Sequence, residues 1–211
     1  MIYNIGINVT MGEDMDSAEN IYALAKDNNG VLTTADAVRA GVSRAVLSRL
    51  AQKGTIERIA YGRYVLPDVL PDELFITQQR SAKIIYSHET ALFLHDLAER
   101  TPIQLSLTIP SNYKLSPALA AGCKVYYIKP DLYNLGKSLL SSKAGHEVVT
   151  YDAERTICDI IRSRSRIDNQ AFAAALRNYA ARKNQNWNRL SQYAEVFHIT
   201  KLLRQYLGVL T

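Results

Sequence analysis

Several polar and basic side chains between positions 43 and 53 could contact nucleic acid. Residues 44–53 (RAVLSRLAQK) predict a short helix in which Val46, Leu47 and Leu50 share one buried side. On the other side, arginine can pair with guanine, glutamine with adenine, and serine with base edges or phosphate. We therefore expect this side to enter a DNA major groove. The candidate contact residues are Ser43, Arg44, Ser48, Arg49, Gln52 and Lys53.

A second group of candidate contact residues follows directly in the chain. Residues 56–66 (IERIAYGRYVL) contain two β-forming runs around a turn at Gly62, which predicts a β-hairpin. Arg58, Tyr61 and Arg63 would lie near its tip, where phosphate or minor-groove contacts could be made. Taken alone, the preceding helix is explained more simply as an exposed amphipathic helix with solvated charges. The hairpin beside it favours DNA binding instead.

The residues before this helix predict the elements that hold it. Thr33 is expected to start a helix, with Asp36 three residues later as an approximate capping box. Gly41 is expected to end that helix at a positive φ angle, and Ser43 to cap the next one. Together with an earlier helix beginning near Asp16, this order predicts a winged helix-turn-helix.

The rest of the chain predicts a second domain with mixed structure. Strands are expected near residues 83–86, 104–109, 124–128 and 147–151. One-faced helices are expected to begin near Asp72, Ser87, Asp152, Asp168, Trp187 and Ile199. The predicted fold class is α+β: an N-terminal winged helix-turn-helix, then a mixed α/β domain ending in a helical bundle. The expected boundaries are a disordered tail (1–15), the winged helix-turn-helix (16–66), a linker (67–71) and a C-terminal domain (72–211).

The charge distribution adds a second basic region. The 211-residue chain is 47% hydrophobic and 21% charged with a net charge of +5, which favours an acidic partner. Residues 39–63 carry six basic residues against one acidic residue, and residues 162–189 carry seven against one. The later region is either a solvated helix end or a second DNA-binding surface. Its candidate residues are Arg162, Arg164, Arg166, Arg182, Lys183 and Arg189.

The sequence gives little support to metal, cofactor or enzyme chemistry. His88 and His95 stand seven residues apart rather than at the four-residue spacing of a metal pair, so structural roles are expected. Glu154 and Asp159 are five apart and do not share a helix face, which disfavours a general acid–base pair. We therefore expect no catalytic residue, no metal and no cofactor.

The cysteines, the hydropathy pattern and the first residues of the chain indicate the cellular compartment. Cys123 and Cys158 have no metal-ligand spacing and are expected to be buried, reduced thiols of a cytoplasmic protein. No apolar run approaches the ~18–20 residues of a membrane span. The first residues lack the basic flank and apolar core of a signal peptide. No membrane association is expected.

Several stretches in order resemble the AbiEi family, the antitoxin half of the abortive-infection AbiE type IV toxin–antitoxin systems. The resemblance covers the chain from about Met15 onward. The segments that carry it are GVLTTADAVRAGVSR, RIAYGRYVLP, YSHETALFLHDLAERTP, LSLTIP and TYDAERTICDII.

This resemblance implies a transcriptional autorepressor that binds inverted repeats in its own promoter. It also implies a C-terminal domain that counters a nucleotidyltransferase-like toxin without a stable complex. The family's DNA-contacting role carries over to the candidate residues in the helix at 44–53 and in the hairpin. Two alternatives stay open: a nucleic-acid-targeted defence effector or enzyme that uses the winged helix for delivery, and a C-terminal protein-interaction module.

Overall fold

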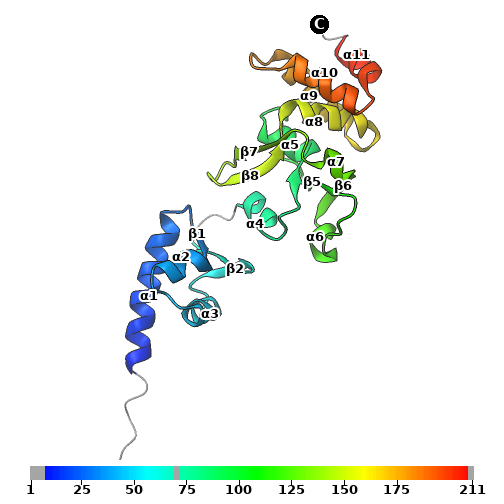
Figure 1. Ribbon diagram of the computed structural model, residues 1–211. Helices are drawn as coiled ribbons and strands as arrows, with labels where there is room; N and C mark the ends of the chain where they lie inside the picture. The colour runs from blue at the N-terminus through cyan, green and yellow to red at the C-terminus, as the bar shows by residue number, and fades with distance from the viewer. Residues whose placement is uncertain (1–7, 69–71, 209–211) are drawn as a thin grey trace, which may run out of the picture. The chain divides into compact units, whose positions relative to one another are not determined.

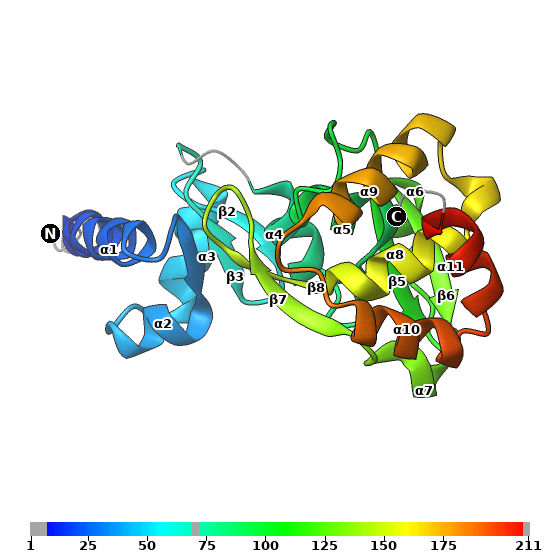
Figure 2. The same cartoon turned by 90° about the horizontal axis from the view of Figure 1, so that it is seen from above.

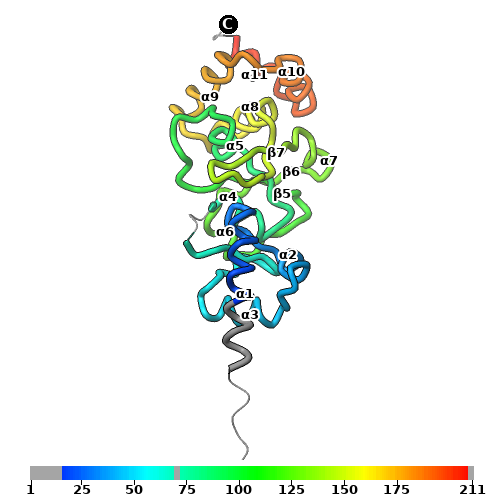
Figure 3. The backbone as a smooth tube through the Cα atoms, turned by 90° about the vertical axis from the view of Figure 1, so that its left-hand side faces the viewer, coloured from blue at the N-terminus to red at the C-terminus, as the bar shows by residue number. Residues whose placement is uncertain are grey.

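The computed structural model describes residues 8–68 and 72–208, and the chain divides into two compact units (Figure 1). The first unit comprises Met1–Arg80 with Lys143–His146, and the second comprises Ser81–Ser142 with Glu147–Thr211. The described residues form a mixed α/β structure with eleven α-helices and two sheets. The path of the chain within each unit can be followed in Figure 3.

The first unit begins with a helix that is longer than expected. Helix α1 (Asn8–Lys26) starts well before Asp16, so the expected disordered tail is helical from residue 8 onward. The sequence of this segment contains no proline, and its methionine and glutamate residues are good helix formers. Residues 1–7 of the expected tail and residues 69–71 of the expected linker lie outside the described residues.

The remaining elements of the first unit are three strands and three helices. They are β1 (Val31–Thr33), α2 (Thr34–Arg39), α3 (Arg44–Gln52), β2 (Glu57–Ala60), β3 (Arg63–Val65) and α4 (Glu73–Gln79). The strands form an antiparallel sheet in the order β1-β3-β2. Leu32 lies opposite Tyr64, and the register of β2 against β3 shifts between Arg58 and Ala60. Strand β1 was not expected from the sequence.

The helix starts in this unit follow the expected capping chemistry. Thr33 and Asp36 form a reciprocal capping box, in which the Asp36 amide donates to Thr33 Oγ1 at 3.1 Å. Gly41 adopts a φ of +84°, and Ser43 Oγ accepts from the Val46 amide at 3.3 Å. Asp72 caps α4 in the same way, accepting from the Phe75 amide at 3.1 Å.

A separate stretch of chain completes the first unit. His146 is buried, and its Nδ1 lies 2.9 Å from Asp72 Oδ2 while its Nε2 lies 3.1 Å from the carbonyl oxygen of Asn29. Its ring also stacks on Phe75 with 4.4 Å between centroids. Residues 143–146 are therefore part of this unit although they are distant from it in sequence. The sequence interpretation began the C-terminal domain at residue 72, whereas the contacts group residues 72–80 and 143–146 with the first unit.

A five-stranded sheet organises the second unit, in the order β6-β5-β4-β8-β7. Strand β4 pairs antiparallel with β5 and parallel with β8, while β5 pairs parallel with β6 and β7 pairs antiparallel with β8. The four expected strands are present and β7 is an additional one. The strands are β4 (Ile85–Tyr86), β5 (Leu105–Pro110), β6 (Cys123–Ile128), β7 (Lys137–Ser141) and β8 (Glu147–Tyr151).

Helices account for much of the second unit and for all of its last third. Short helices α5 (His88–Leu94), α6 (Pro117–Ala121) and α7 (Pro130–Tyr133) lie between the strands in sequence. Helix α8 (Ala153–Arg162) is followed by the 3₁₀ turn η1 (Arg164–Arg166) and then by α9 (Asn169–Ala181), α10 (Trp187–Val196) and α11 (Thr200–Leu207). Helix α8 packs against α5, α9, α10 and α11, and Figure 2 shows α9 and α10 on either side of it.

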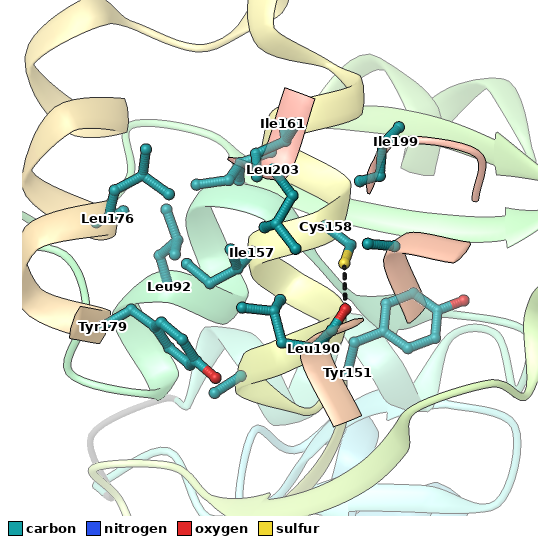
Figure 4. Close-up of a cluster of buried hydrophobic side chains, with 14 of the residues drawn as sticks. Leu92, Tyr151, Ile157, Cys158, Ile161, Leu176, Tyr179, Leu190, Ile199 and Leu203 are labelled. Atoms are coloured by element: carbon teal, nitrogen blue, oxygen red, sulfur yellow. Dashed lines mark hydrogen bonds between the residues drawn. The ribbon is translucent and has the colours of Figure 1, made fainter. Parts of the chain in front are cut away.

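The hydrophobic core of the second unit is built around α8. Ile157 and Ile161 pack with Leu92 of α5, Leu176 of α9 and Leu190 of α10 (Figure 4). Figure 4 also shows the buried Cys158 thiol, which donates to the Leu190 carbonyl oxygen at 3.8 Å. Tyr151, Tyr179, Ile199 and Leu203 belong to the same cluster and are labelled in Figure 4. The expected packing of the last four helices on one another is therefore present.

Helix α8 departs from the expected pattern on its polar side. The sequence predicts a helix with one buried face, but all of its residues from Ala153 to Ile161 are buried. Arg155 is completely buried, and its Nε donates to Asp159 Oδ2 at 3.0 Å. The polar side of this helix therefore forms ion pairs inside the unit instead of facing water.

Candidate nucleic-acid interface

Helix α3 has one side in the core and one side in solvent. Leu47 and Leu50 are buried against the rest of the first unit. Arg44, Ser48 and Gln52 are exposed and follow each other at four-residue spacing, so they lie along one stripe of the helix. Each of these side chains is long enough or polar enough to contact a groove of nucleic acid.

The other residues predicted around α3 have different surroundings. Lys53, the C-cap of the helix, is exposed, and Arg49 is half-buried at the edge of the stripe. Ser43 is exposed, but its hydroxyl oxygen accepts the Val46 amide hydrogen as the helix cap. Ser43 therefore has a structural role in fixing the start of α3, and its hydroxyl keeps one hydrogen to donate and one lone pair to accept elsewhere.

The hairpin formed by β2 and β3 carries the second group of predicted contact residues. Tyr61 is 91% exposed at the turn. Arg58 is exposed as well, and its guanidinium carbon lies 5.7 Å from the centre of the Tyr61 ring, while its Nε donates to the Ala60 carbonyl oxygen at 3.3 Å. Arg63 is half-buried in β3. Arg58 and Tyr61 thus form the exposed tip together.

The turn of the hairpin is tied to the start of α2. The Thr34 amide donates to the Gly62 carbonyl oxygen at 2.8 Å. Gly62 has a φ of +67°, and a Cβ atom at this position would lie 3.2 Å from Thr34 Oγ1. Asp36, in the same first turn of α2, has its pKa lowered chiefly by the hydrogen bond from the Thr33 side chain. The hydrogen bond from the Thr34 amide to the Gly62 carbonyl oxygen thus holds the turn of the hairpin beside the start of α2.

The second basic region consists of two groups. In the first group, Arg162 pairs with Asp159 at 3.2 Å, Arg164 lies over the Phe172 ring, and Arg166 lies over the Tyr126 ring at 4.1 Å from its centre. All three follow or end α8. All three contact side chains of their own unit. The alternative of a solvated helix end therefore does not describe them fully.

The second group lies at the other end of α8. Arg189 Nη1 is 3.7 Å from Asp152 Oδ2, and Asp152 is the N-cap of α8. Arg182 follows the end of α9 and donates to Asn184 Oδ1 at 3.1 Å, with the exposed Lys183 next to it in sequence. Helix α8 has 10 residues and therefore spans roughly 15 Å from one group to the other. The structure therefore does not bring Arg162 and Arg189 together in one patch.

Sequence reasoning missed the ionised groups inside the second unit. Arg155 donates from Nη1 to the carbonyl oxygens of Leu132 and Leu135, at 3.1 and 2.7 Å, besides pairing with Asp159. Burial raises the pKa of Asp159, and the charges of Arg155 and Arg162 oppose that rise. The available signal was an arginine and an aspartate four residues apart in a helix with apolar residues on both sides.

The histidines considered as a metal pair and the carboxylates considered as an acid–base pair bind protein groups. His88 lies between the hydroxyls of Ser87 and Ser163, at 2.9 and 3.0 Å, and His95 Nε2 lies 2.7 Å from the Tyr151 carbonyl oxygen. This confirms the expected structural roles. Glu154 accepts from the Tyr179 hydroxyl at 3.2 Å, away from the Arg155–Asp159 pair.

The two cysteines differ in their surroundings. Cys158 is buried, and burial raises the pKa of its thiol to about 12. Cys123 is only half-buried, because it opens the outer strand β6 of the sheet. The expectation of two buried thiols was therefore wrong for Cys123. In the part of the chain that the structure describes, no helix is long and apolar enough to cross a membrane.

Comparisons with known proteins give a family for one segment and a likeness of fold for most of the chain. Residues 19–67 match the family model described as a transcriptional regulator, AbiEi antitoxin. The fold is similar to the crystal structure of the RV2827C protein from Mycobacterium tuberculosis, with a TM-score of 0.53 and 14% sequence identity. That likeness covers 92% of this chain and 81% of the other. The search of curated proteins found no match.

Proposed function

From the match of residues 19–67 to the AbiEi antitoxin transcriptional regulators, we propose that the first unit is a winged helix-turn-helix that binds promoter DNA. In this proposal α3 enters the major groove and the β2–β3 hairpin is the wing. One observation carries it: Arg44, Ser48 and Gln52 form an exposed stripe, while Leu47 and Leu50 anchor the opposite side of the helix.

The remaining candidate residues supply contacts to the DNA backbone in this proposal. Lys53 and Arg58 are exposed cations on α3 and the wing, and Arg58 lies beside the exposed Tyr61 ring. Phosphate contacts position a protein on the duplex, whereas contacts to base edges give the sequence preference. Arg49, Arg63 and the Ser43 hydroxyl belong to the same proposed interface.

The proposed target is double-stranded DNA with inverted repeats in the promoter of the protein's own operon, where binding represses transcription. Fluorescence anisotropy with this promoter fragment and a shuffled fragment of equal length tests it. We expect tighter binding to the promoter and a steep loss of affinity with salt, about 0.9 log units per log unit of salt for each neutralised phosphate. Equal affinity for both fragments, or a flat salt response, contradicts the proposal.

We further propose that the second unit is the antitoxin part and that it acts without catalysis. The family that residues 19–67 match is described as an antitoxin regulator, and that match lies in the first unit. We assign the antitoxin role to the second unit because the first unit is proposed to bind DNA. The proposed target is a nucleotidyltransferase-like toxin of the same operon, countered without a stable complex. Co-expression of that toxin with the full chain under an unrelated promoter is expected to restore growth. The Arg44→Ala variant should protect equally well, since α3 serves only repression in this scheme. Loss of protection in that variant contradicts the separation of functions.

Basic residues of the second unit are proposed to add contacts to the DNA backbone. Because these residues form two groups at opposite ends of α8, each group is tested by itself. Arg164→Gln with Arg166→Gln removes two of the three charges of the first group, and Lys183→Gln with Arg189→Gln removes two of the three of the second. A group that contacts phosphates lowers the slope of log affinity against log salt, by about 0.9 for each lost contact. Lys201→Gln with Arg204→Gln, at exposed positions on α11, removes two positive charges elsewhere and controls for the change in net charge. Unchanged slopes in both double variants contradict a second surface.

A further inference from the structure

A small polar cavity in the second unit contains groups that suit a bound anion. It has a volume of about 130 Å³, well above the ~10–15 Å³ that one water molecule requires. Helices α5 and α8 and strands β5 and β6 contribute its walls. Its polar lining residues include one acid, Asp159, together with His88, Thr108, Tyr126, Arg155, Arg162 and Ser163.

Two buried polar atoms of this lining lack a hydrogen-bond partner among the described residues. They are Nη2 of Arg155 and the hydroxyl of Tyr126. Arg155 is 0% exposed and Tyr126 is 5% exposed. Leaving a buried donor unsatisfied costs free energy, and more so when the donor is charged. Arg155 Nη2 can only donate and the Tyr126 hydroxyl can also donate, so a single acceptor in the cavity would satisfy both groups.

The charge around the cavity is positive. Arg155 and Arg162 share a single carboxylate, that of Asp159, at 3.0 and 3.2 Å. Arg166 adds a further positive charge at 4.1 Å from the Tyr126 ring centre. The pKa of His88 is held well below its usual value, first by burial and then by Arg166, Arg155 and Arg162. His88 is therefore neutral at pH 7, and the arginines outnumber the acid.

Hydroxyl groups complete the walls of the cavity. Thr108 donates to Ser87 Oγ at 2.8 Å, and the His88 ring links Ser87 Oγ to Ser163 Oγ. His88 also stacks on Tyr126, with ring centroids 3.4 Å apart, and is one of the residues with a positive φ, at +48°. An αL conformation is costly for a histidine and is retained where surrounding contacts demand it. This network fixes Ser163, Thr108 and Tyr126 around the cavity.

From these contacts we infer that the cavity between α5, α8 and β6 binds a phosphate group, with Arg155, Arg162 and the Tyr126 hydroxyl as donors. A phosphate oxygen accepts several hydrogen bonds at once, and arginine is the side chain best suited to hold it. The group is either inorganic phosphate or the phosphate of a nucleoside monophosphate. This inference concerns the second unit and does not depend on DNA binding by α3.

The test is isothermal titration of the full chain with inorganic phosphate at constant ionic strength. We expect saturable binding of one phosphate per chain. Tyr126→Phe removes only the unpartnered hydroxyl and should weaken binding about tenfold, because a hydrogen bond to a charged group is lost. The same change should not lower the melting temperature in phosphate-free buffer, since no protein hydrogen bond is broken. Arg162→Gln should weaken binding at least as much.

Matched variants separate the site from general effects. Tyr206→Phe on α11 removes a tyrosine hydroxyl elsewhere, and Arg204→Gln removes an exposed positive charge from the same unit. Both should bind phosphate like the parent. Titration with adenosine monophosphate and with adenosine then identifies the source: tighter binding of the monophosphate indicates a nucleotide, and tighter binding of phosphate indicates the free ion.

Three results overturn the inference. The first is the absence of saturable binding of both inorganic phosphate and adenosine monophosphate. The second is unchanged affinity in both Tyr126→Phe and Arg162→Gln. The third is saturable binding of adenosine that is as tight as that of phosphate and of the monophosphate. Because the titration contains no DNA, none of these results bears on promoter recognition. Conversely, if the protein does not bind the promoter, the phosphate titration still tests the cavity by itself.

Discussion

Replacing Arg44 by alanine tests the proposed recognition helix most directly. Arg44 is the first residue of α3 and is exposed, so its removal should change the unfolding free energy by no more than about 0.5 kcal/mol. A bidentate contact to guanine is worth about 1–3 kcal/mol of discrimination. This corresponds to a loss of about 5- to 150-fold in affinity for the promoter.

The structure offers a matched control on the preceding helix. The Arg39 side chain is 78% exposed on α2 and pairs with Asp36. Arg39→Ala therefore removes the same charge from the same unit without touching the exposed stripe of α3. We expect it to lower the affinity for promoter and shuffled DNA alike, and by less than Arg44→Ala lowers promoter affinity.

Salt titrations decide what Arg44 contacts. If it reads a base edge, Arg44→Ala loses promoter preference while the salt slope changes little. If it contacts a phosphate, affinity falls for both fragments and the slope decreases by about 0.9. Anisotropy measured at four or more salt concentrations distinguishes the two. The recognition-helix proposal is refuted if Arg44→Ala, Ser48→Ala and Gln52→Ala all bind the promoter like the parent protein.

Three further predictions concern stability and are checked by urea unfolding. Thr33→Ala should lower the unfolding free energy by about 1 kcal/mol because the capping box is lost, and Thr33→Ser should restore most of it. Leu47→Ala should cost about 2–5 kcal/mol, since the side chain is completely buried, whereas Ala45→Gly at an exposed position of the same helix should cost about 1 kcal/mol. The protein should lose stability as the pH falls below 6.5: the unfolded chain protonates His88 there, while the folded chain, with its lowered pKa, does not. His88 alone gives a slope of up to about 1.4 kcal/mol per pH unit, and identical stability at pH 7.5 and 5.5 would contradict its buried, neutral state.

The local features of the first unit could be predicted from the sequence because they depend on few neighbouring residues. Thr33 with Asp36, Gly41 and Ser43 determine where helices begin and end through short-range hydrogen bonds and backbone angles. The apolar positions 47 and 50 face the core as their spacing indicates. Once the buried positions of α3 are assigned, positions 44, 48 and 52 remain for the opposite side, so their exposure could also be predicted.

The strands that were missed are short or lie at a sheet edge. Strand β1 has three residues, too few for a period of two to be recognised. In β7 the adjacent Leu139 and Leu140 hide the alternation, and Leu139 is more than half exposed because the strand is at the edge of its sheet. Pairing with distant strands, not the local sequence, makes these segments extended.

The polar interior of the second unit could not be predicted, since it depends on residues far apart in the chain. Arg155 is buried because carbonyl oxygens of residues 132 and 135 and the Asp159 carboxylate surround it. Nothing in the sequence near Arg155 specifies those partners. Arginine is rarely buried, so a solvated position was the natural expectation.

The inclusion of residues 143–146 in the first unit affects the order in which the protein folds. His146 binds the Asn29 carbonyl oxygen and Asp72, so the first unit lacks one of its buried side chains until that segment has been synthesised. Domains generally fold in turn as the chain emerges from the ribosome, the N-terminal one first. Here the final contacts of the N-terminal unit form only after strands β4 to β7 have been made. Maturation of the first unit is thereby coupled in time to synthesis of the sheet that follows it.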